Sequence, residues 1–286
     1  MAAYRLGFSR VPAPYGDPAA DEALTADVAA GQPPSTSRMG DYLAARTRFF
    51  DQVVAGAIGR GMRQIVLGAA GYDGRAFRYA KPGVRWFEVD HPDTQRDKRD
   101  RLDRLGLTSP QPRFVEADFT RDPVAERLLA AGLDPARPSL FLLEGVAVYL
   151  EPAVLETVLS QFRQVASLRS RLAISVSPSG ADAGRRARFR ASVAALGEPA
   201  RSAFEAGEAA ELLARTGWQV TAGDADDPEA AARCERQRSA GLLLARAARA
   251  PSRTTRWSCI AAATRWQLTA PVSAPELRLI ILFARY

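Results

Sequence analysis

Three glycines follow a short apolar run within Gln64–Arg75 and could bring the backbone close to a ligand. The run Ile65–Leu67 is typical of a strand buried on both faces, and Gly68, Gly71 and Gly74 come directly after it. In parallel α/β sheets, ligands lie at the carboxyl ends of the strands. The stretch therefore predicts the first strand and the cofactor loop of a nucleotide-binding sheet.

Acidic residues follow at the ends of the next predicted strands, so that one rim of the sheet receives several carboxylates. Burying unpaired carboxylates is costly, and their convergence indicates a cationic or donor-rich ligand. A pyrophosphate would be repelled by an acid inside the glycine loop, whereas S-adenosylmethionine carries a positive sulfonium and ammonium, and an arginine can meet its carboxylate. The acids are Asp73, Glu88 or Asp90, Asp118 and Glu144.

Several of these positions have two open interpretations. Asp90 stands 22 residues after Gly68, where α/β nucleotide folds place a carboxylate against ribose hydroxyls, but it could also cap the helix that begins near Pro92. Both roles can hold together. Arg46 and Arg48, on the helix before the loop, are either solvated or ligand-binding. His91 is interpreted as a loop residue.

The remaining pattern alternates strands with helices, which predicts a parallel, doubly wound sheet. Helical spacing or capping residues mark the predicted helices 21–30, 41–58, 75–79, 92–105, 152–166, 182–196 and 208–215. Apolar runs mark the predicted strands 65–67, 85–90, 113–119, 139–143, 172–176, 218–221 and 241–245.

Composition excludes several classes of protein. The 286 residues contain two cysteines and one histidine, too few for a zinc cluster or a Ser/His/Asp hydrolase of ordinary design. No apolar run approaches the roughly 20 residues of a membrane span, and Met1–Arg10 lacks a signal-peptide core, so we expect a cytoplasmic protein. The net charge of +7 resides in the C-terminal part, where ten arginines and only two acids follow residue 232. We therefore expect neither a nucleic-acid nor a membrane partner.

Four motifs at these strand ends resemble the leucine carboxyl methyltransferase family and its bacterial S-adenosylmethionine-dependent relatives. The similarity covers about residues 38–177, and it implies a Rossmann-like, mostly parallel seven-stranded sheet of the class I methyltransferase type, with an N-terminal helical embellishment. The cofactor that it implies is S-adenosyl-L-methionine. The motifs are Leu67–Ala76, Phe87–Pro92, Ala117–Phe119 and Leu143–Leu150.

The resemblance also implies roles for individual residues. Gly68 would approach the methionine part of the cofactor, Asp90 would hold the ribose, and Asp118 with Phe119 would flank the adenine. Glu144 would lie near the methionyl amino group and Arg46 would bind the carboxylate. Gly71 and Asp73 complete the expected cofactor-binding set, in which no catalytic residue and no metal ligand is assigned. The family usually reads Leu-Gly-Ala-Gly, so the additional alanine of Ala69–Ala70 is expected to lengthen the loop.

Three segments are expected in the chain. Residues 1–40 form an N-terminal segment, 41–249 the methyltransferase domain, and 250–286 an extension that we expect either to be poorly ordered or to add a strand. Within the domain, 178–205 is expected to be a substrate-covering insertion. Its arginines are open to two interpretations, a solvated helix face or contacts to an anionic acceptor: Arg185, Arg186, Arg188 and Arg190.

The predicted reaction is methyl transfer to an oxygen of a small molecule or peptide carboxyl terminus. A carboxylate is favoured because it is ionised at neutral pH and needs no general base, which suits a chain with one histidine. Tyr149 lies either against the acceptor or in the core. Two alternatives are a nicotinamide-dependent oxidoreductase, supported by the glycine spacing, and a binding module without turnover.

Overall fold

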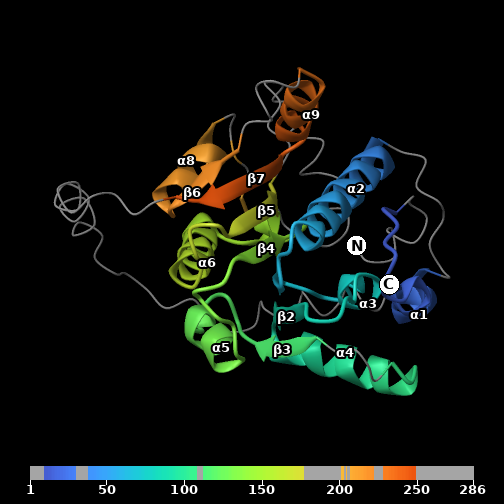
Figure 1. Ribbon diagram of the computed structural model, residues 1–286. Coiled ribbons are helices and arrows are strands. Elements are labelled where there is room, and N and C mark those ends of the chain that lie inside the picture. The colour runs from blue at the N-terminus through green and yellow to red at the C-terminus, as the bar shows by residue number, and fades with distance from the viewer. Residues whose placement is uncertain are drawn as a thin grey trace.

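The protein is described by a computed structural model for residues 10–29, 38–107, 112–176, 201–202, 204, 207–221 and 228–248. Seven strands form one sheet in the order β3-β2-β1-β4-β5-β7-β6 (Figure 1). The pairs among β1 to β5 are parallel, and β7 runs antiparallel to both β5 and β6. The predicted fold class, a mostly parallel seven-stranded sheet, is confirmed.

The strands and helices have the following bounds. The strands are β1 (Gln64–Gly68), β2 (Arg85–Asp90), β3 (Arg113–Glu116), β4 (Ser139–Leu143), β5 (Arg171–Ser175), β6 (Trp218–Val220) and β7 (Leu242–Ala247). The helices are α1 (Pro18–Ala29), α2 (Arg38–Gly59), α3 (Arg75–Arg78), α4 (Pro92–Arg104), α5 (Val124–Ala130), the 3-10 helix η2 (Ala147–Tyr149), α6 (Pro152–Gln164), α8 (Glu208–Arg215) and α9 (Pro228–Ser239).

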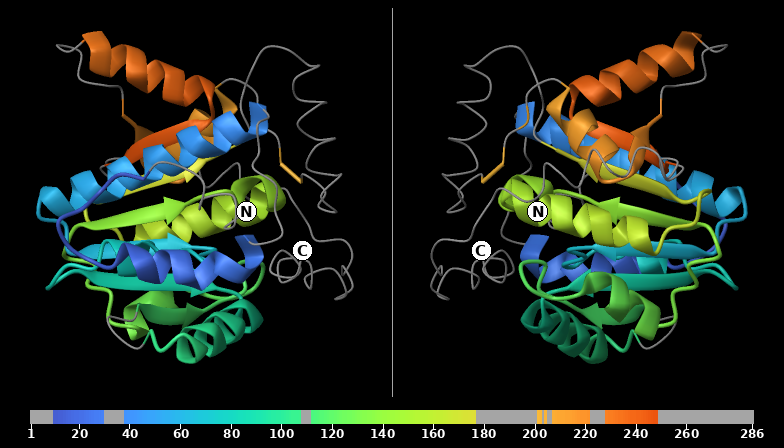
Figure 2. Two further views of the ribbon diagram at one scale, coloured as in Figure 1. Left: turned by 90° about the vertical axis from the view of Figure 1, so that its right-hand side faces the viewer. Right: turned by 90° about the vertical axis from the view of Figure 1, so that its left-hand side faces the viewer.

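Helices cover both faces of the sheet, because the central strands are apolar on both sides. Ile65 and Leu67 of β1 pack with α2, whereas Val66 between them packs with α5, α6 and α8. This alternation follows from the two-residue period of a strand. Figure 2 shows α1 and α2 in front in one view and α6 and α8 in front in the opposite view.

The N-terminal segment packs against the sheet domain at α3. Leu24 of α1 is fully buried in a cluster with Phe77. Asp17 donates its backbone N–H to the Phe77 carbonyl at 3.0 Å, and the Tyr79 hydroxyl donates to the Val11 carbonyl at 2.7 Å. The predicted helical embellishment is therefore joined to the core by both apolar and polar contacts.

Some predicted elements differ from the structure. The third strand was expected to reach Phe119 but ends at Glu116, because Asp118 turns the chain by accepting hydrogen bonds from both the backbone and the hydroxyl of Thr120. Helices α5 and α9 and the 3-10 helix were not predicted. Most of the predicted insertion 178–205, its four arginines and the extension 250–286 lie outside the described residues.

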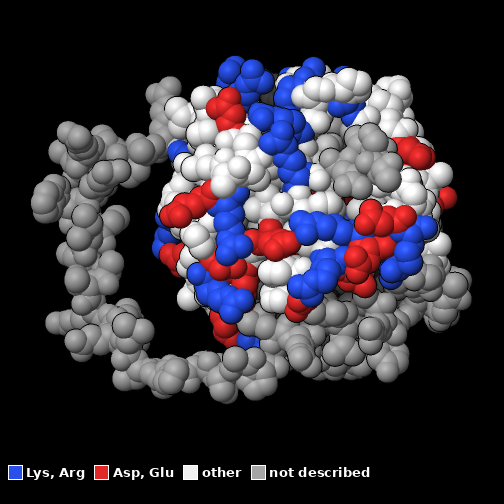
Figure 3. All heavy atoms as spheres, turned by 90° about the horizontal axis from the view of Figure 1, so that it is seen from below, with Lys and Arg blue, Asp and Glu red and all other residues white. Residues whose placement is uncertain are grey.

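The charged face of α4 is locally compensated. Seen from below, blue and red side chains are interspersed (Figure 3). On this helix Arg96 pairs with Asp93 at 2.8 Å, and Arg99 pairs with Glu116 of β3 at 2.8 Å. Among the described helices, none is both long and apolar enough to span a membrane.

Candidate functional site

The sheet reverses its strand order between β1 and β4, and the candidate site lies at the carboxyl ends of these strands. From β1 the chain proceeds outward through β2 and β3, then returns to β4 on the other side of β1. In open parallel sheets, the helices cross to opposite faces on either side of such a point, and ligands bind there. Gly68 ends β1, Asp90 ends β2 and Glu144 follows β4, so the structure brings these three predicted residues to one edge.

Asp90 fastens the glycine loop to the end of β2. Its Oδ2 accepts the backbone N–H of Gly71 at 2.6 Å, and its Oδ1 accepts that of His91 at 2.7 Å. Burial raises the pKa of the Asp90 carboxyl, while these two N–H groups act in the opposite direction. Each carboxylate oxygen retains a second acceptor position, so a ligand hydroxyl can still be bound.

The alternative role of Asp90 as a helix cap is wrong. His91 is the N-cap residue of α4, and its Nδ1 accepts the backbone N–H of Asp93 at 3.3 Å. Pro92 at the first helical position has no N–H to satisfy. His91 is thus a loop residue, as the sequence predicted, and it also caps α4, which the sequence did not predict.

Buried side chains fill the space next to the Cα of Gly68 and leave little room for a side chain there. A Cβ on Gly68 would lie 2.6 Å from Leu143 Cδ2 and 3.1 Å from Phe162 Cζ. The next residue, Ala69, has a φ of +51°, which L-amino acids with a side chain adopt at a cost. One of the two consecutive alanines of this loop therefore occupies a left-handed position that suits glycine better.

Replacing Ala69 by glycine is expected to stabilise the protein. The gain in the free energy of unfolding is about 0.5–1 kcal/mol, since relief of the left-handed conformation exceeds the entropy that glycine adds to the unfolded chain. Urea denaturation measures this change. Ala70→Gly is the matched control: Ala70 is not among the residues with positive φ, so this variant should lose stability. A loss of stability in both variants would contradict the prediction.

The acids at the rim are partnered within the protein, which corrects the expectation of unpaired carboxylates. Asp73 pairs with Arg75 at 2.7 Å, and Glu88 pairs with Lys98 at 2.6 Å. Glu88 also lies fully buried under the loop instead of at the rim. The argument that the number of carboxylates demands a cationic ligand therefore fails, as does the argument that the charge of Asp73 would repel a pyrophosphate.

Arg46 and Glu144 form an ion pair next to the glycine loop. Arg46 Nε lies 3.2 Å from Glu144 Oε1, and both side chains are about 95% buried. Arg48, the other candidate on α2, is exposed. Tyr42, one turn before Arg46, adds a hydroxyl beside this pair, and burial raises its pKa against the opposing effect of Arg46. Tyr42 was not predicted as a site residue, although its i, i+4 spacing to Arg46 places the two on one face of the helix.

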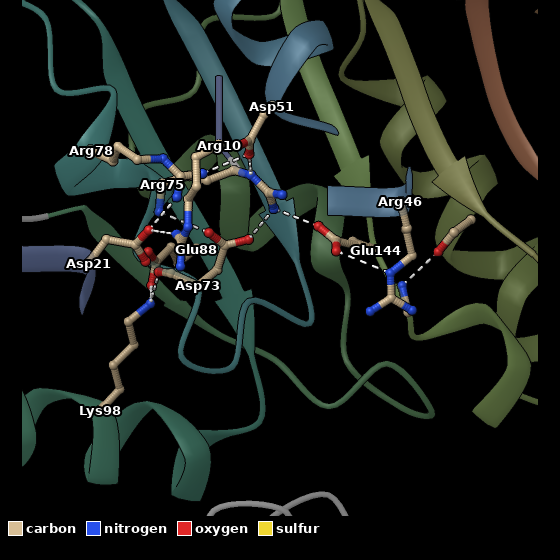
Figure 4. Close-up of polar contacts among 12 residues, drawn as sticks. Arg10, Asp21, Arg46, Asp51, Asp73, Arg75, Arg78, Glu88, Lys98 and Glu144 are labelled. Carbon is tan, nitrogen blue, oxygen red and sulfur yellow. Dashed lines mark hydrogen bonds and ion pairs between the residues drawn. The ribbon is translucent and has the colours of Figure 1, made fainter. Parts of the chain in front are cut away.

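Arg75 joins this ion pair to the rest of the rim and was missed as a site residue. Its guanidinium lies between Asp51, Asp73 and Glu144, with Arg46 on the far side of Glu144 (Figure 4). Arg75 Nη1 contacts Glu144 Oε2 at 2.5 Å, and Nε contacts Asp51 Oδ1 at 2.8 Å. The sequence held no signal for the contact to Glu144, which is 69 residues away.

Lys98 supports the loop from below. Besides its pairing with Glu88, its Nζ donates to the backbone carbonyl of Asp73 at 2.8 Å. Burial raises the pKa of the Glu88 carboxyl to about 7, although Lys98 lowers it. Lys98 of α4 thus links the glycine loop to the buried carboxylate of Glu88 on β2.

Asp118 and Phe119 lie at the next strand end. The hydrogen bonds from Thr120, together with Arg121, outweigh burial and lower the pKa of the Asp118 carboxyl. Phe119 packs against the core near Gly68. Tyr149, in η2, is partly buried. The ligand contacts expected of these three residues stay predictions.

Solved structures share the fold. A DUF574 family protein from Streptomyces avermitilis superposes with a TM-score of 0.54 at 18% identity, covering 86% of this chain and 96% of that one. A provisionally named methyltransferase from Thermobifida fusca gives a TM-score of 0.52 at 16% identity, covering 85% and 97%. At such identities the similarity concerns the fold alone.

Curated relatives are closer in sequence. A Mycolicibacterium paratuberculosis protein, provisionally named an S-adenosyl-L-methionine-dependent methyltransferase, is 35% identical over 207 residues, which are 68% of this chain and 66% of the relative. A Parafrankia protein with the same provisional name is 45% identical over 139 residues, 48% of this chain and 44% of the relative. The chain thus matches less than two thirds of the length of these relatives.

The family model described as leucine carboxyl methyltransferase matches residues 10–163, which are more than half of the chain and include every strand from β1 to β4. The chain belongs to the leucine carboxyl methyltransferase family.

Proposed function

We propose that this protein is an S-adenosyl-L-methionine-dependent methyltransferase that acts on an oxygen atom, with a carboxylate as the favoured acceptor. The observation that carries the proposal is the buried Arg46–Glu144 pair beside the glycine loop, at the point where the sheet reverses its strand order. The family membership supports the same activity.

The Arg46–Glu144 pair fits the amino acid part of the cofactor. That part is a zwitterion, with one carboxylate and one ammonium on the same carbon. A guanidinium and a carboxylate held 3.2 Å apart offer one complementary charge to each. Binding would exchange the ion pair within the protein for two pairs with the ligand, so the net charge of the site stays balanced.

The neighbouring strand ends fit the adenosine part. Asp90, held by two backbone N–H groups, presents acceptor positions to the ribose hydroxyls. Asp118 and Phe119 provide an acceptor and an aromatic ring at the next strand end. The glycine loop between them and Glu144 has no side chain at Gly71, where a Cβ would meet no other atom within 4 Å, so a ligand can approach the backbone there.

Methyl transfer to a carboxylate requires no general acid or base from the protein. When bound, the cofactor would supply an electrophilic methyl group on a sulfonium, whose sulfur would become a neutral thioether after transfer. The protein aligns the acceptor with the methyl and excludes water. A carboxylate attacks without losing a proton, which fits a chain whose one histidine caps α4.

Isothermal titration is the test of the cofactor. The purified 286-residue protein is expected to bind S-adenosylmethionine and S-adenosylhomocysteine, but neither NADH nor NADPH. Binding of the nicotinamides alone would overturn the proposal in favour of an oxidoreductase.

The acceptor class is tested on the same preparation with cofactor carrying a radiolabelled methyl group. Small carboxylic acids and peptides with a free C-terminus are the probes. A methyl ester releases labelled methanol in mild alkali, whereas aryl ethers and methylated amines keep their label. Alkali-stable product would exclude a carboxylate acceptor and leave the cofactor assignment intact.

A further inference from the structure

Arg75 occupies the centre of a chain of alternating charges that reaches the candidate site. Its side chain is 1% exposed and contacts three carboxylates, those of Asp51, Asp73 and Glu144. Burial disfavours its charge, but these carboxylates outweigh burial and raise the pKa of Arg75 well above its ordinary value. The guanidinium is therefore a permanent cation inside the protein.

The contact with Glu144 divides the two oxygens of this carboxylate between two partners. Oε2 lies 2.5 Å from Arg75 Nη1, and Oε1 lies 3.2 Å from Arg46 Nε. The shorter, more buried contact holds one oxygen, and the other oxygen faces Arg46 (Figure 4). Without Arg75, the carboxylate could turn about its terminal bond, because that torsion is broad.

Arg75 differs from Arg78, the other buried arginine of α3, in that it contacts Glu144. Each of the two side chains leaves one buried nitrogen without a hydrogen-bond partner among the described residues, Nη2 in Arg75 and Nε in Arg78. Arg78, by comparison, joins Asp51 to Asp21 and could by itself tie α2 to the N-terminal segment.

We propose that Arg75 is a positioning residue that fixes Glu144 so that its Oε1 receives the amino group of the methionyl part of the cofactor. This inference rests on the proposed function. Asp51 and Asp73 hold Arg75 in turn, so that the orientation of Glu144 is set from α2 and the glycine loop. The amino-group subsite is thus determined by a residue that does not contact the ligand's amino group itself.

The test compares ligands with and without the amino acid part. S-adenosylhomocysteine carries the amino and carboxyl groups, its decarboxylated analogue keeps only the amino group, and 5′-methylthioadenosine lacks both. In Arg75→Lys, titration calorimetry is expected to show about tenfold weaker binding of S-adenosylhomocysteine and its decarboxylated analogue, because the charged hydrogen bond from Glu144 to their amino group is misdirected. The affinity for methylthioadenosine should stay within about threefold of the wild type. Arg75→Gln, which keeps one planar donor group, is measured in parallel.

Two controls separate positioning from folding. Arg78→Lys alters a buried arginine of the same helix that pairs with Asp51 and Asp21, and it should leave the ratio of the affinities unchanged. In the Glu144→Gln background, Arg75→Lys should have no further effect on S-adenosylhomocysteine, because the two residues act in series. Thermal unfolding of each variant shows whether it is folded.

Each outcome decides one question. Equal weakening of all three ligands in Arg75→Lys, or loss of folding in both Arg75 variants, would assign Arg75 to the stability of the fold and overturn the positioning role alone. Failure of the wild type to bind S-adenosylhomocysteine and methylthioadenosine would overturn the proposed function, and this inference with it.

Discussion

Asp90→Ala should lose cofactor binding, with an affinity for S-adenosylhomocysteine at least about 100-fold below that of the wild type. Two effects add. The Gly71 N–H loses its carboxylate acceptor, so the glycine loop is no longer fastened to β2. The ribose hydroxyls lose the acceptor that the proposed function assigns to them. Hydrogen bonds to a charged group contribute about 1.5–3 kcal/mol each, and their combined loss gives this magnitude.

Titration calorimetry measures the affinity, and Asp93→Ala is the matched control. Asp93 lies three residues after Asp90, in the first turn of α4, but its side chain is 44% exposed and pairs with Arg96. Its replacement should leave binding within about threefold of the wild type, as exposed ion pairs contribute little. If Asp90→Ala bound S-adenosylhomocysteine as tightly as this control, Asp90 would have no part in the site.

Lys98→Met should destabilise the fold by about 3–5 kcal/mol at pH 8, because it leaves the buried carboxylate of Glu88 without its cation. Both side chains of this pair are 1% exposed, so water cannot replace the lost partner. The Asp73 carbonyl loses the same donor. Urea denaturation at several pH values measures the free energy of unfolding.

The deficit of Lys98→Met should shrink as the pH is lowered. In the wild type, burial raises the pKa of Glu88 from 4.5 to about 7. Between these values the folded protein holds a proton that the unfolded chain has released, so the contribution of Glu88 to the free energy of unfolding falls as pH rises toward 7. Without Lys98 the pKa of Glu88 rises further, and the fall continues to higher pH. The variant should therefore be closer to the wild type at pH 6 than at pH 8.

Two further variants complete this test. Arg96→Met removes an exposed cation from the same helix and should change stability by less than about 0.5 kcal/mol. The double variant Glu88→Gln/Lys98→Met removes both charges and should recover much of the loss, since replacing a whole buried pair is far less costly than breaking it. A deficit that is constant between pH 6 and pH 8 would show that Glu88 does not titrate in this range.

Local patterns in the sequence determined the order of the elements and the positions of the strand ends. The apolar run of β1 and the glycines after it predicted the loop, and the acids at the ends of β2 and β4 were placed at the correct rim. These inferences succeeded because burial on both faces, helix capping and tight turns each leave a mark within a few residues. The third strand was predicted too long and α5 was not predicted, because the turn at Asp118 lies directly after the strand and before the helix.

Only the tertiary structure decided how the charges at the rim are balanced. Nothing near Glu144 in the sequence indicates that Arg75 and Arg46 hold its two oxygens, since these partners lie 69 and 98 residues away. The sequence likewise left Asp90 between two roles, and the structure excluded the helix cap because His91 is the N-cap residue of α4. The energy of an ion pair depends on the distance between the two charges in space and not on their separation along the chain. Patterns of residue type therefore reveal the acids but not their partners.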